Sequence, residues 1–499
     1  MVYRPLTSAV LLILLCMSTF LEVSILPTPV SQGETGHAAL ISLNGPSPHV
    51  PYNKSIYWES MEHIRRAELL DVRSFSGEPQ ELKPLSSSPN DWIVTGEEAH
   101  EDEVIILTGN LIVQAGGSLT LINCTLLMNC TYDKVWGIFV KRSGILNVLG
   151  GSNITAYNPE YGFLFHVYGR LIMHDSFLSG CKGVELYTIE SVKLCNTTIS
   201  NRLYGVYCGG SSSITIINCT ISSNEWDGIH CHWSSDISII GCTISSNQNG
   251  IICRKSSGVN IIGCTISDNF KGIYCYWSSN ISIVNCTVSS NWWSIDCRGS
   301  SNINIIGCTI SDNTLDGVYL AGSHGISIIN CTISDNGWGM YHDGIRCDRS
   351  SNISVINCTI NNNGYGIHCL ESSDISITGC AISINFKGIY CDRSSNITVH
   401  YCDIYSNRAH GLYNYGKYVV NASYCWWGSS DGPEYKKRGD PDDPEEVYSY
   451  HGLEYLLCWP WLKKPYRLAE LSEPQPTPPP PGVVLAPNYG ALILSLIHI

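Results

Sequence analysis

Two aspartates in the second half of the chain have the placement of a catalytic acid pair. Asp316 and Asp343 each stand directly before the glycine of a Gly-Val or Gly-Ile dipeptide, in successive repeats. Stacked parallel strands would bring their carboxylates to within about 5 Å of each other. Neighbouring carboxylates raise each other's pKa and so provide an acid and a base. With His342 and Arg346 beside them, the pair predicts polysaccharide hydrolysis. A lyase would instead need a Ca²⁺ site and an Arg or Lys base.

The position of these aspartates is not reserved for acids. Asp227 occupies it several repeats earlier. The repeats between carry Asn249, Lys271 and Ser294. Aspartate also suits a turn for its own sake, because its side chain bonds the nearby backbone. One acid pair without a surrounding motif is weak support for catalysis, so the sequence favours a non-catalytic protein.

Aromatic and charged residues recur at outward positions near the same turns. Sugar rings pack their apolar faces on aromatic side chains, and their hydroxyls bond to charged groups. This side of the molecule is therefore predicted to bind a polysaccharide or cell-surface glycan. The candidate carbohydrate-binding residues are Trp226, His232, Trp233, Tyr274, Tyr276, Trp277, Trp292, Trp293, Tyr341 and Arg346. The alternative is that exposed aromatic residues are simply common in such turns, in a structural surface-layer protein.

Cysteines mark the repeat that must position these side chains. Over Cys208–Cys308 they follow one another at eleven residues, with one step of twelve, and alternate between the phrases NCT or GCT and GIxC. The repeat is therefore about 22 residues long. Each repeat holds three short runs of strand periodicity, such as Ile281–Ile283, Cys286–Val288 and Ile295–Cys297. Three strands per repeat without helical periodicity predict an all-β parallel β-helix, right-handed by the crossover preference.

The regular cysteines allow three interpretations. Stacked coils place them about 4.8 Å apart, within reach of a disulfide, and export would favour oxidation. Side chains in a parallel ladder point the same way, however, which opposes the dihedral angle of about 90° that a disulfide needs. Metal binding needs thiolates, which buried apolar surroundings disfavour. Packing as small hydrophobic residues is the favoured interpretation.

A column of asparagines accompanies the cysteines. We expect these amides to hydrogen-bond from coil to coil at one turn. The column consists of Asn224, Asn247, Asn269, Asn291, Asn313, Asn336, Asn363, Asn385 and Asn407. Sequons in the NCT phrases are predicted to be structural amides, whereas Asn280, Asn352 and Asn396 are predicted to be accessible for glycosylation.

Net charge and the chain ends limit partners and location. A formal net charge of -14 excludes a nucleic-acid partner, because phosphate binding needs a concentrated basic surface. The sequence indicates no cofactor or metal and leaves the oligomeric state open. A basic residue followed by a short apolar run predicts export, and hence a secreted or cell-surface protein.

We divide the chain into six segments. They are a signal peptide (1–26), a region with a capping helix at Ser55–Val72 (27–90), roughly fourteen β-helix coils (91–428), a closing segment (429–471), a Pro-rich linker (472–482) and an apolar tail read as a truncated membrane anchor (483–499).

The repeats resemble a known class of proteins. The phrases SSNISIVNCTVSSN and NFKGIYC, with an opening coil at Asp91–Leu126 and the phrase WWGSSDGPE at Trp426–Glu434, resemble NosD-like, pectate-lyase-like parallel β-helix proteins of secreted and archaeal cell-surface type. The resemblance implies the architecture. It implies no activity, because this fold hosts lyases, hydrolases, epimerases and binding proteins. The copper-linked name does not transfer, since no exposed His, Met or Cys cluster resembles a copper site. The GIxC column is broken at Leu320, and a longer insertion follows Asn336.

The sequence therefore predicts an exported β-helix protein that binds or displays polysaccharide along an aromatic-rich face without catalysis. Two alternatives stay open. One is a polysaccharide hydrolase or lyase that uses Asp316 and Asp343, and the other is a structural surface-layer protein.

Overall fold

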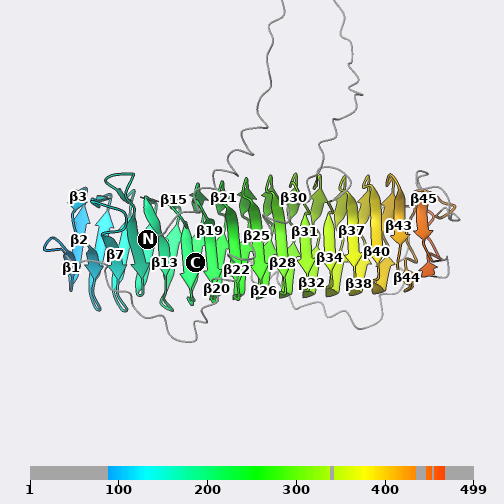
Figure 1. Ribbon diagram of the computed structural model, residues 1–499, viewed down its shortest axis with the longest axis horizontal. Coiled ribbons are helices and arrows are strands. Elements are labelled where there is room, and N and C mark those ends of the chain that lie inside the picture. The colour runs from blue at the N-terminus through cyan, green and yellow to red at the C-terminus, as the bar shows by residue number, and fades with distance from the viewer. Residues whose placement is uncertain (1–87, 338–341, 434–444, 452–454, 467–499) are drawn as a thin grey trace, which may run out of the picture. The chain divides into compact units, whose positions relative to one another are not determined.

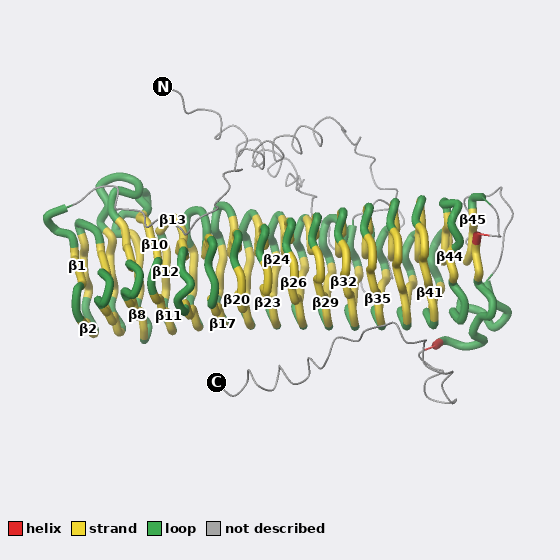
Figure 2. Tube along the Cα trace, turned by 90° about the horizontal axis from the view of Figure 1, so that it is seen from below, coloured by secondary structure: helices red, strands yellow, loops and turns green. Residues whose placement is uncertain are grey.

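The computed structural model describes residues 88–337, 342–433, 445–451 and 455–466, all within one compact unit, Phe75–Ile499. Its strands run from β1 (Trp92–Val94) to β46 (Leu456–Leu457) and form three parallel sheets. Up to β44 every third strand joins the same sheet, so the chain winds as a parallel β-helix, as predicted. Figure 1 looks onto one sheet, and Figure 2 shows the turns that join the three.

The first sheet, called sheet A, contains sixteen strands and carries the candidate site. Its strands are β1, β4 (Leu111–Val113), β7 (Gly137–Val140), β10 (Phe163–Val167), β13 (Cys181–Leu186), β16 (Val206–Gly209), β19 (Asp227–His232), β22 (Asn249–Arg254), β25 (Lys271–Tyr276), β28 (Trp293–Arg298), β31 (Val318–Ala321), β34 (Ile345–Asp348), β37 (Tyr365–Leu370), β40 (Lys387–Asp392), β43 (His410–Asn414) and β45 (Glu445–Ser449).

The other two sheets complete each coil. Sheet B has sixteen strands, from β2 (Glu97–Glu101) to β46, and sheet C has fourteen, from β3 (Val104–Leu107) to β42 (Asp403–Tyr405). A representative coil consists of β26 (Ser279–Val284) in sheet B, β27 (Thr287–Ser289) in sheet C and β28 in sheet A. These are the three strands predicted for this repeat, and Cys286 lies in the turn directly before β27.

Sheets A and B each contain fifteen strands before residue 428, close to the roughly fourteen coils predicted, and each gains one more strand beyond it. In the segment assigned to closing, β45 pairs in parallel with β43, and β46 pairs with β44 (Val420–Asn421). Trp427, just before this segment, is fully buried, and Trp461 within it packs against the core. The β-helix therefore continues into that segment.

Inward side chains form one continuous core of Ile, Val, Leu and Cys. In sheet A the cysteine column aligns Cys275 with Cys297, is broken by Leu320 as the sequence indicates, and resumes at Cys347. Every cysteine of the described part carries a free thiol. Burial raises the pKa of Cys380 and Cys402, which keeps these thiols protonated. This arrangement corresponds to the packing interpretation.

The predicted asparagine column is confirmed. Asn291 shows the pattern: its Nδ2 donates to Asn313 Oδ1 (3.2 Å), to Ile266 O (3.0 Å) and to Ser289 O (2.9 Å). Its own Oδ1 accepts from the backbone N–H of Asn269 at 3.0 Å. Buried amides with all groups bonded tie each coil to the next at the turn between sheets C and A.

A serine column between sheets A and B went unnoticed in the sequence. The backbone N–H of Ser278 donates to Ser300 Oγ at 3.1 Å, and that of Ser300 donates to Ser323 Oγ at 3.2 Å. Ser278 Oγ in turn donates to Cys253 O at 2.9 Å. Serine is also common in exposed turns, so the repeated SS phrase did not distinguish a buried column from a solvated one.

The division of the sequons into structural and accessible ones is wrong. Asn285, in an NCT phrase, is exposed and left-handed (φ 52°), just as Asn280 is (φ 53°) near the start of β26. Asn396, predicted to be accessible, donates its Nδ2 to Asp374 Oδ1 at 2.6 Å. Left-handed asparagines thus stand at both ends of the strands of sheet B, and the NCT and SSN phrases do not separate bonded amides from accessible ones.

Several expectations fall outside the described residues. These are the signal peptide (1–26), the capping helix at Ser55–Val72, the Pro-rich linker (472–482), the apolar tail (483–499) and Tyr341 in the insertion after Asn336. Within the described ranges, no helix is long and apolar enough to cross a membrane.

Candidate functional site

The outer face of sheet A is built from the variable residue of the GIxC phrase. Strand pairing places these residues side by side in one column along the axis. The column reads Tyr207, His230, Ile252, Tyr274, Asp296, Tyr319, Arg346, His368, Tyr390, Tyr413 and Tyr448. We call it the central column. Successive members are about 4.8 Å apart, so aromatic rings of neighbouring coils come into contact.

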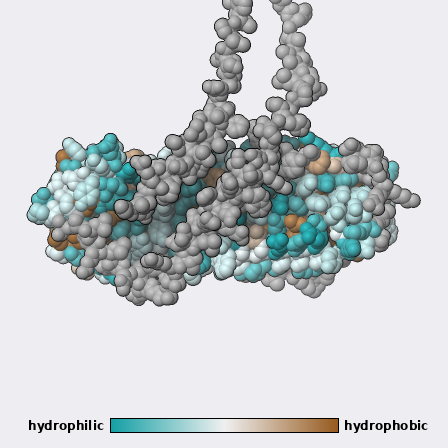
Figure 3. All heavy atoms as spheres, in the orientation of Figure 1, coloured by the Kyte–Doolittle hydropathy of each residue, from teal (hydrophilic) through white to brown (hydrophobic). Residues whose placement is uncertain are grey.

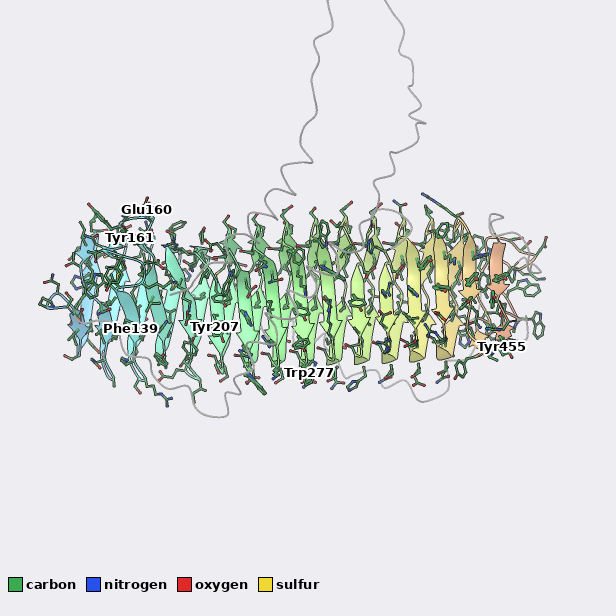
Figure 4. The ribbon with its side chains drawn as sticks, in the orientation of Figure 1. Phe139, Glu160, Tyr161, Tyr207, Trp277 and Tyr455 are labelled. Carbon is green, nitrogen blue, oxygen red and sulfur yellow. The ribbon has the colours of Figure 1, made fainter. Side chains whose placement is uncertain are left out.

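Tryptophans border this face along both turns. Trp226 and Trp292 are exposed before β19 and β28, whereas Trp233 (47% exposed) and Trp277 (61% exposed) follow β19 and β25. Figure 4 shows Tyr207 on the face of sheet A and Trp277 at its lower edge. In Figure 3 the coloured surface toward the two ends of the molecule is mainly hydrophilic, with isolated hydrophobic patches.

The predicted residues that the structure describes lie on the strands of sheet A and along its two borders. His232, Tyr274, Tyr276, Trp293 and Arg346 belong to strands of sheet A. The four exposed tryptophans form its borders. Contacts join neighbouring members: the rings of Tyr274 and Tyr276 stack at 6.0 Å, and those of Tyr276 and Trp277 lie 5.9 Å apart. Among the described members, ring contacts join only residues of the same coil or of neighbouring coils.

The N-terminal part of the face is an aromatic and histidine cluster. His230 Nδ1 lies 2.8 Å from Asp227 Oδ2, which orients the imidazole. The His230 ring lies 5.2 Å from Tyr207 and 5.9 Å from Tyr204, and Tyr204 meets Trp226 edge-on at 5.3 Å. Tyr204 and Tyr207 were not among the predicted binding residues. They lie in the coil before Trp226, the first of those residues along the chain.

The middle of the face is an ion-pair and aromatic cluster. Asp296 is fully buried, 2.9 Å from Arg298 Nε and 3.5 Å from Lys271 Nζ. The Arg298 guanidinium also lies over the rings of Tyr274 (5.8 Å) and Tyr319 (5.5 Å). Cationic groups over aromatic faces are favourable contacts, and the two cations give the buried Asp296 carboxyl group its ion-pair partners.

The predicted acid pair does come together, but through the backbone. The backbone N–H of Asp343 donates to Asp316 Oδ1 at 2.7 Å. Asp343 Oδ2 lies 2.8 Å from His368 Nδ1 and 3.8 Å from an Arg346 nitrogen. The two aspartates are only 5% and 1% exposed. Both carboxylates are therefore engaged by groups of the chain itself.

Burial shapes the protonation of this pair. Burial and the nearby charge of Asp343 raise the pKa of the Asp316 carboxyl well above its usual range. Burial also lowers the pKa of His342, whose Nδ1 lies 3.8 Å from Asp316 Oδ1. A carboxyl group with a raised pKa can hold the proton that general acid catalysis needs. Burial in a structural turn raises the pKa of a carboxyl group in the same way.

The comparison column of the sequence analysis needs one correction. Lys271 of β25 pairs with Trp293 of β28, so Trp293, and not Ser294, occupies the position of Asp316 in the preceding coil. Ser294 occupies the position of the glycine, which this coil lacks. Within the described ranges, no group of three or more His, Cys, Asp or Glu is placed to hold a metal ion.

The chain belongs to the protein family described as right handed beta helix region, which matches residues 176–293 and 293–432. The predicted right-handed sense is thereby confirmed. No curated protein sequence matches the chain.

Three solved structures show how far the similarity extends. The A-module of mannuronan C-5 epimerase AlgE6 from Azotobacter vinelandii has 13% identity and a TM-score of 0.32, over 63% of this chain and 91% of its own. The periplasmic alginate epimerase AlgG has 15% identity and a TM-score of 0.33, over 69% and 84%. PfbA, a surface adhesin of Streptococcus pneumoniae, has 12% identity and a TM-score of 0.27, over 70% and 83%. Similarities at this level carry no information about ligand or activity.

Proposed function

We propose that the outer face of sheet A binds an extended polysaccharide lengthwise, outside the cell or at its surface, without cleaving it. The central column carries the proposal. From Tyr207 to Tyr448 it carries aromatic, His and charged side chains at nearly every coil, with tryptophans on both borders. Tyr274, Asp296 and His368 are buried within it, and the other polar and aromatic members are partly exposed. Sugar rings need such aromatic faces, and their hydroxyls need the charged groups between them.

The length of the face supports a polymer as ligand. Tyr207 belongs to β16 and Tyr448 to β45, so the column crosses eleven strands of sheet A. At about 4.8 Å per coil this is roughly 48 Å. A small molecule would use one cluster, and the remaining aromatic residues would have no role.

The condition of the acid pair supports binding without cleavage. Asp316 accepts a hydrogen bond from the Asp343 backbone, and Asp343 is held by His368. A general acid must reach the glycosidic oxygen of its substrate. Two almost fully buried carboxylates engaged by the chain suit a structural role better.

Binding to a glycan array, followed by affinity measurements on the polymers that bind, tests the proposal. The Trp233→Ala/Trp277→Ala variant removes one border of the face and should weaken binding at least tenfold, since buried aromatic contacts contribute about 1 kcal/mol or more each. Thr287→Val/Thr309→Val, on the outer face of sheet C, is the matched control and should bind as the parent does. Equal binding by both variants would remove sheet A from consideration.

Cleavage is the second candidate, and the raised pKa of Asp316 is the observation that favours it. The parent protein and the Asp316→Asn and Asp343→Asn variants are incubated with acidic and neutral polysaccharides. New reducing ends or unsaturated products from the parent, lost in both variants, would establish a hydrolase or lyase. No turnover by the parent eliminates this candidate.

Export, surface attachment and the narrower NosD-like assignment are parts of the same proposal. Five exposed asparagines of the NCT and SSN phrases make no side-chain hydrogen bond with the described part of the chain and offer a marker for export. They are Asn218, Asn285, Asn330, Asn352 and Asn357. Mass spectrometry of the native protein should find glycans there and not at Asn196, whose Nδ2 donates to Asp175 Oδ1 at 2.9 Å.

A further inference from the structure

Lys387, the first residue of β40, places its ammonium group among three tyrosine rings of successive coils. Its Nζ lies 4.0 Å from the ring centroid of Tyr413, 4.6 Å from that of Tyr390 and 5.2 Å from that of Tyr365. Tyr390 and Tyr413 belong to the central column, and their rings lie 5.3 Å apart. The three rings and the ammonium therefore form one group on the outer face of sheet A.

Lys387 differs from the other cations in the middle of this face. Lys271 and Arg298 are paired with Asp296, and Arg346 is paired with Asp343 and Asp348. Lys387 has no ion pair with any acidic residue of the described part of the chain. In a protein with a formal net charge of -14, an unpaired cation on a face full of ion pairs is unexpected.

Leaving this cation unpaired is unfavourable. The side chain is half-buried, and burial lowers the pKa of the Lys387 ammonium to about 8. Ring faces offset part of the lost hydration, but a buried charge without an opposite charge or hydrogen-bond acceptor still costs free energy. A ligand that brings an anionic oxygen would remove this cost.

We propose that Lys387, Tyr365, Tyr390 and Tyr413 form a subsite for an anionic sugar, with its carboxylate or sulfate oxygen on the ammonium and its ring on a tyrosine. The polymer bound by sheet A is then an acidic polysaccharide. This inference rests on the proposed function and specifies its ligand. A neutral glucan would leave the Lys387 ammonium unpaired, because it has no anionic group.

The test compares three polymers and three variants. Polygalacturonate supplies carboxylates, dextran sulfate supplies sulfates, and dextran supplies neither. Lys387→Met keeps the length of the side chain and removes its charge, Lys387→Arg keeps the charge, and Lys417→Met removes the charge of an exposed lysine between β43 and β44. Affinities are measured by isothermal titration calorimetry with the full chain, and circular dichroism checks the fold.

We expect Lys387→Met to lose about tenfold in affinity for one of the two acidic polymers, as for one charged hydrogen bond, with dextran binding unchanged. Lys387→Arg should retain most of that affinity, and Lys417→Met all of it. The polymer that responds identifies the anion as a carboxylate or a sulfate.

The outcomes separate this inference from the proposed function. The subsite is wrong if the protein binds dextran with the same affinity as the acidic polymers, or if Lys387→Met binds the acidic polymers with the affinity of the parent. In either case sheet A remains a polysaccharide face. If none of the polymers nor any array glycan binds, the proposed function fails, and the subsite fails with it.

Discussion

Sheets A and C belong to the same coils and share one core, yet their outer faces differ. In sheet C the outward position repeats almost unchanged, with Thr265, Thr287, Thr309 and Thr332 in direct register. In sheet A the central column changes residue type from coil to coil. Stacking, core packing and turn hydrogen bonds are the same for both, so the fold does not require the variation in sheet A.

Sheet B shows that an outer face need not vary. Its two outward columns hold small polar residues, such as Ser282 and Asn304, and β-branched apolar ones, such as Val284 and Ile306. Like the threonines of sheet C, these residues suit a stacked, pleated surface. Two faces follow strand propensity, and the third departs from it. Such a departure is typical of a surface with a ligand.

The largest effect is expected from a residue that serves both faces. Asn291→Ala removes an amide whose two N–H groups donate to three surrounding oxygens, and it leaves the backbone N–H of Asn269 without its acceptor. The free energy of unfolding should fall by about 3 kcal/mol or more. Chemical denaturation measures it, with exposed Ser290→Ala as control. A loss below about 1 kcal/mol would mean that water replaces the amide.

The next effect is confined to sheet A. Arg298→Met leaves the fully buried Asp296 with Lys271 alone, so stability should fall by about 2 kcal/mol. Asp296→Asn/Arg298→Met removes the stranded charge and should recover most of that loss. Thermal unfolding of the two variants measures the difference. If the double variant is no more stable than the single one, packing of the Arg298 side chain explains the loss.

A smaller, pH-dependent effect is expected from Lys387. Its pKa is about 8 in the folded protein, below that of an unfolded lysine, so the folded state disfavours the charged form. Between about pH 8 and 10 the unfolded chain binds more protons at this site, and stability gains with rising pH. His410, His368 and the three tyrosines also face this region, so the parent is compared with Lys387→Met. The melting-temperature difference between them should change over that range. A constant difference would contradict the lowered pKa.

The smallest effect is expected on sheet C. Thr287→Val keeps the β-branched shape at an exposed position and should change the free energy of unfolding by less than about 0.5 kcal/mol. Binding of any polysaccharide should be unchanged, as measured by calorimetry. A marked loss of binding would show that sheet C contributes to the ligand face.

The sequence predicted what repeats and missed what occurs once. The eleven-residue spacing of cysteines and the asparagine column determine the coil, the core and one turn, because an inward residue has the same neighbours in every coil. The hydrogen bond that Asp343 Oδ2 accepts from His368 Nδ1 joins residues that no motif links. The group around Lys387 likewise depends on which aromatic residues three coils happen to carry.

The predicted binding residues show the same limit. Trp233 and Trp277 are conspicuous in sequence and lie at the border, whereas Tyr319 and Arg298 form the middle of the face. An alignment of the GIxC phrases predicts the central column, because it includes the register of the strands. Residue types without that register do not predict it.

The nearly constant step of about 22 residues between equivalent positions has an evolutionary consequence. Duplication or loss of one whole repeat brings together coils with the same strands and turns. The protein can therefore change length while the packing of neighbouring coils stays the same. Each such event would add or remove one position for contact with a chain-like ligand. The number of repeats in the gene would then determine the length of polymer that a single molecule can contact.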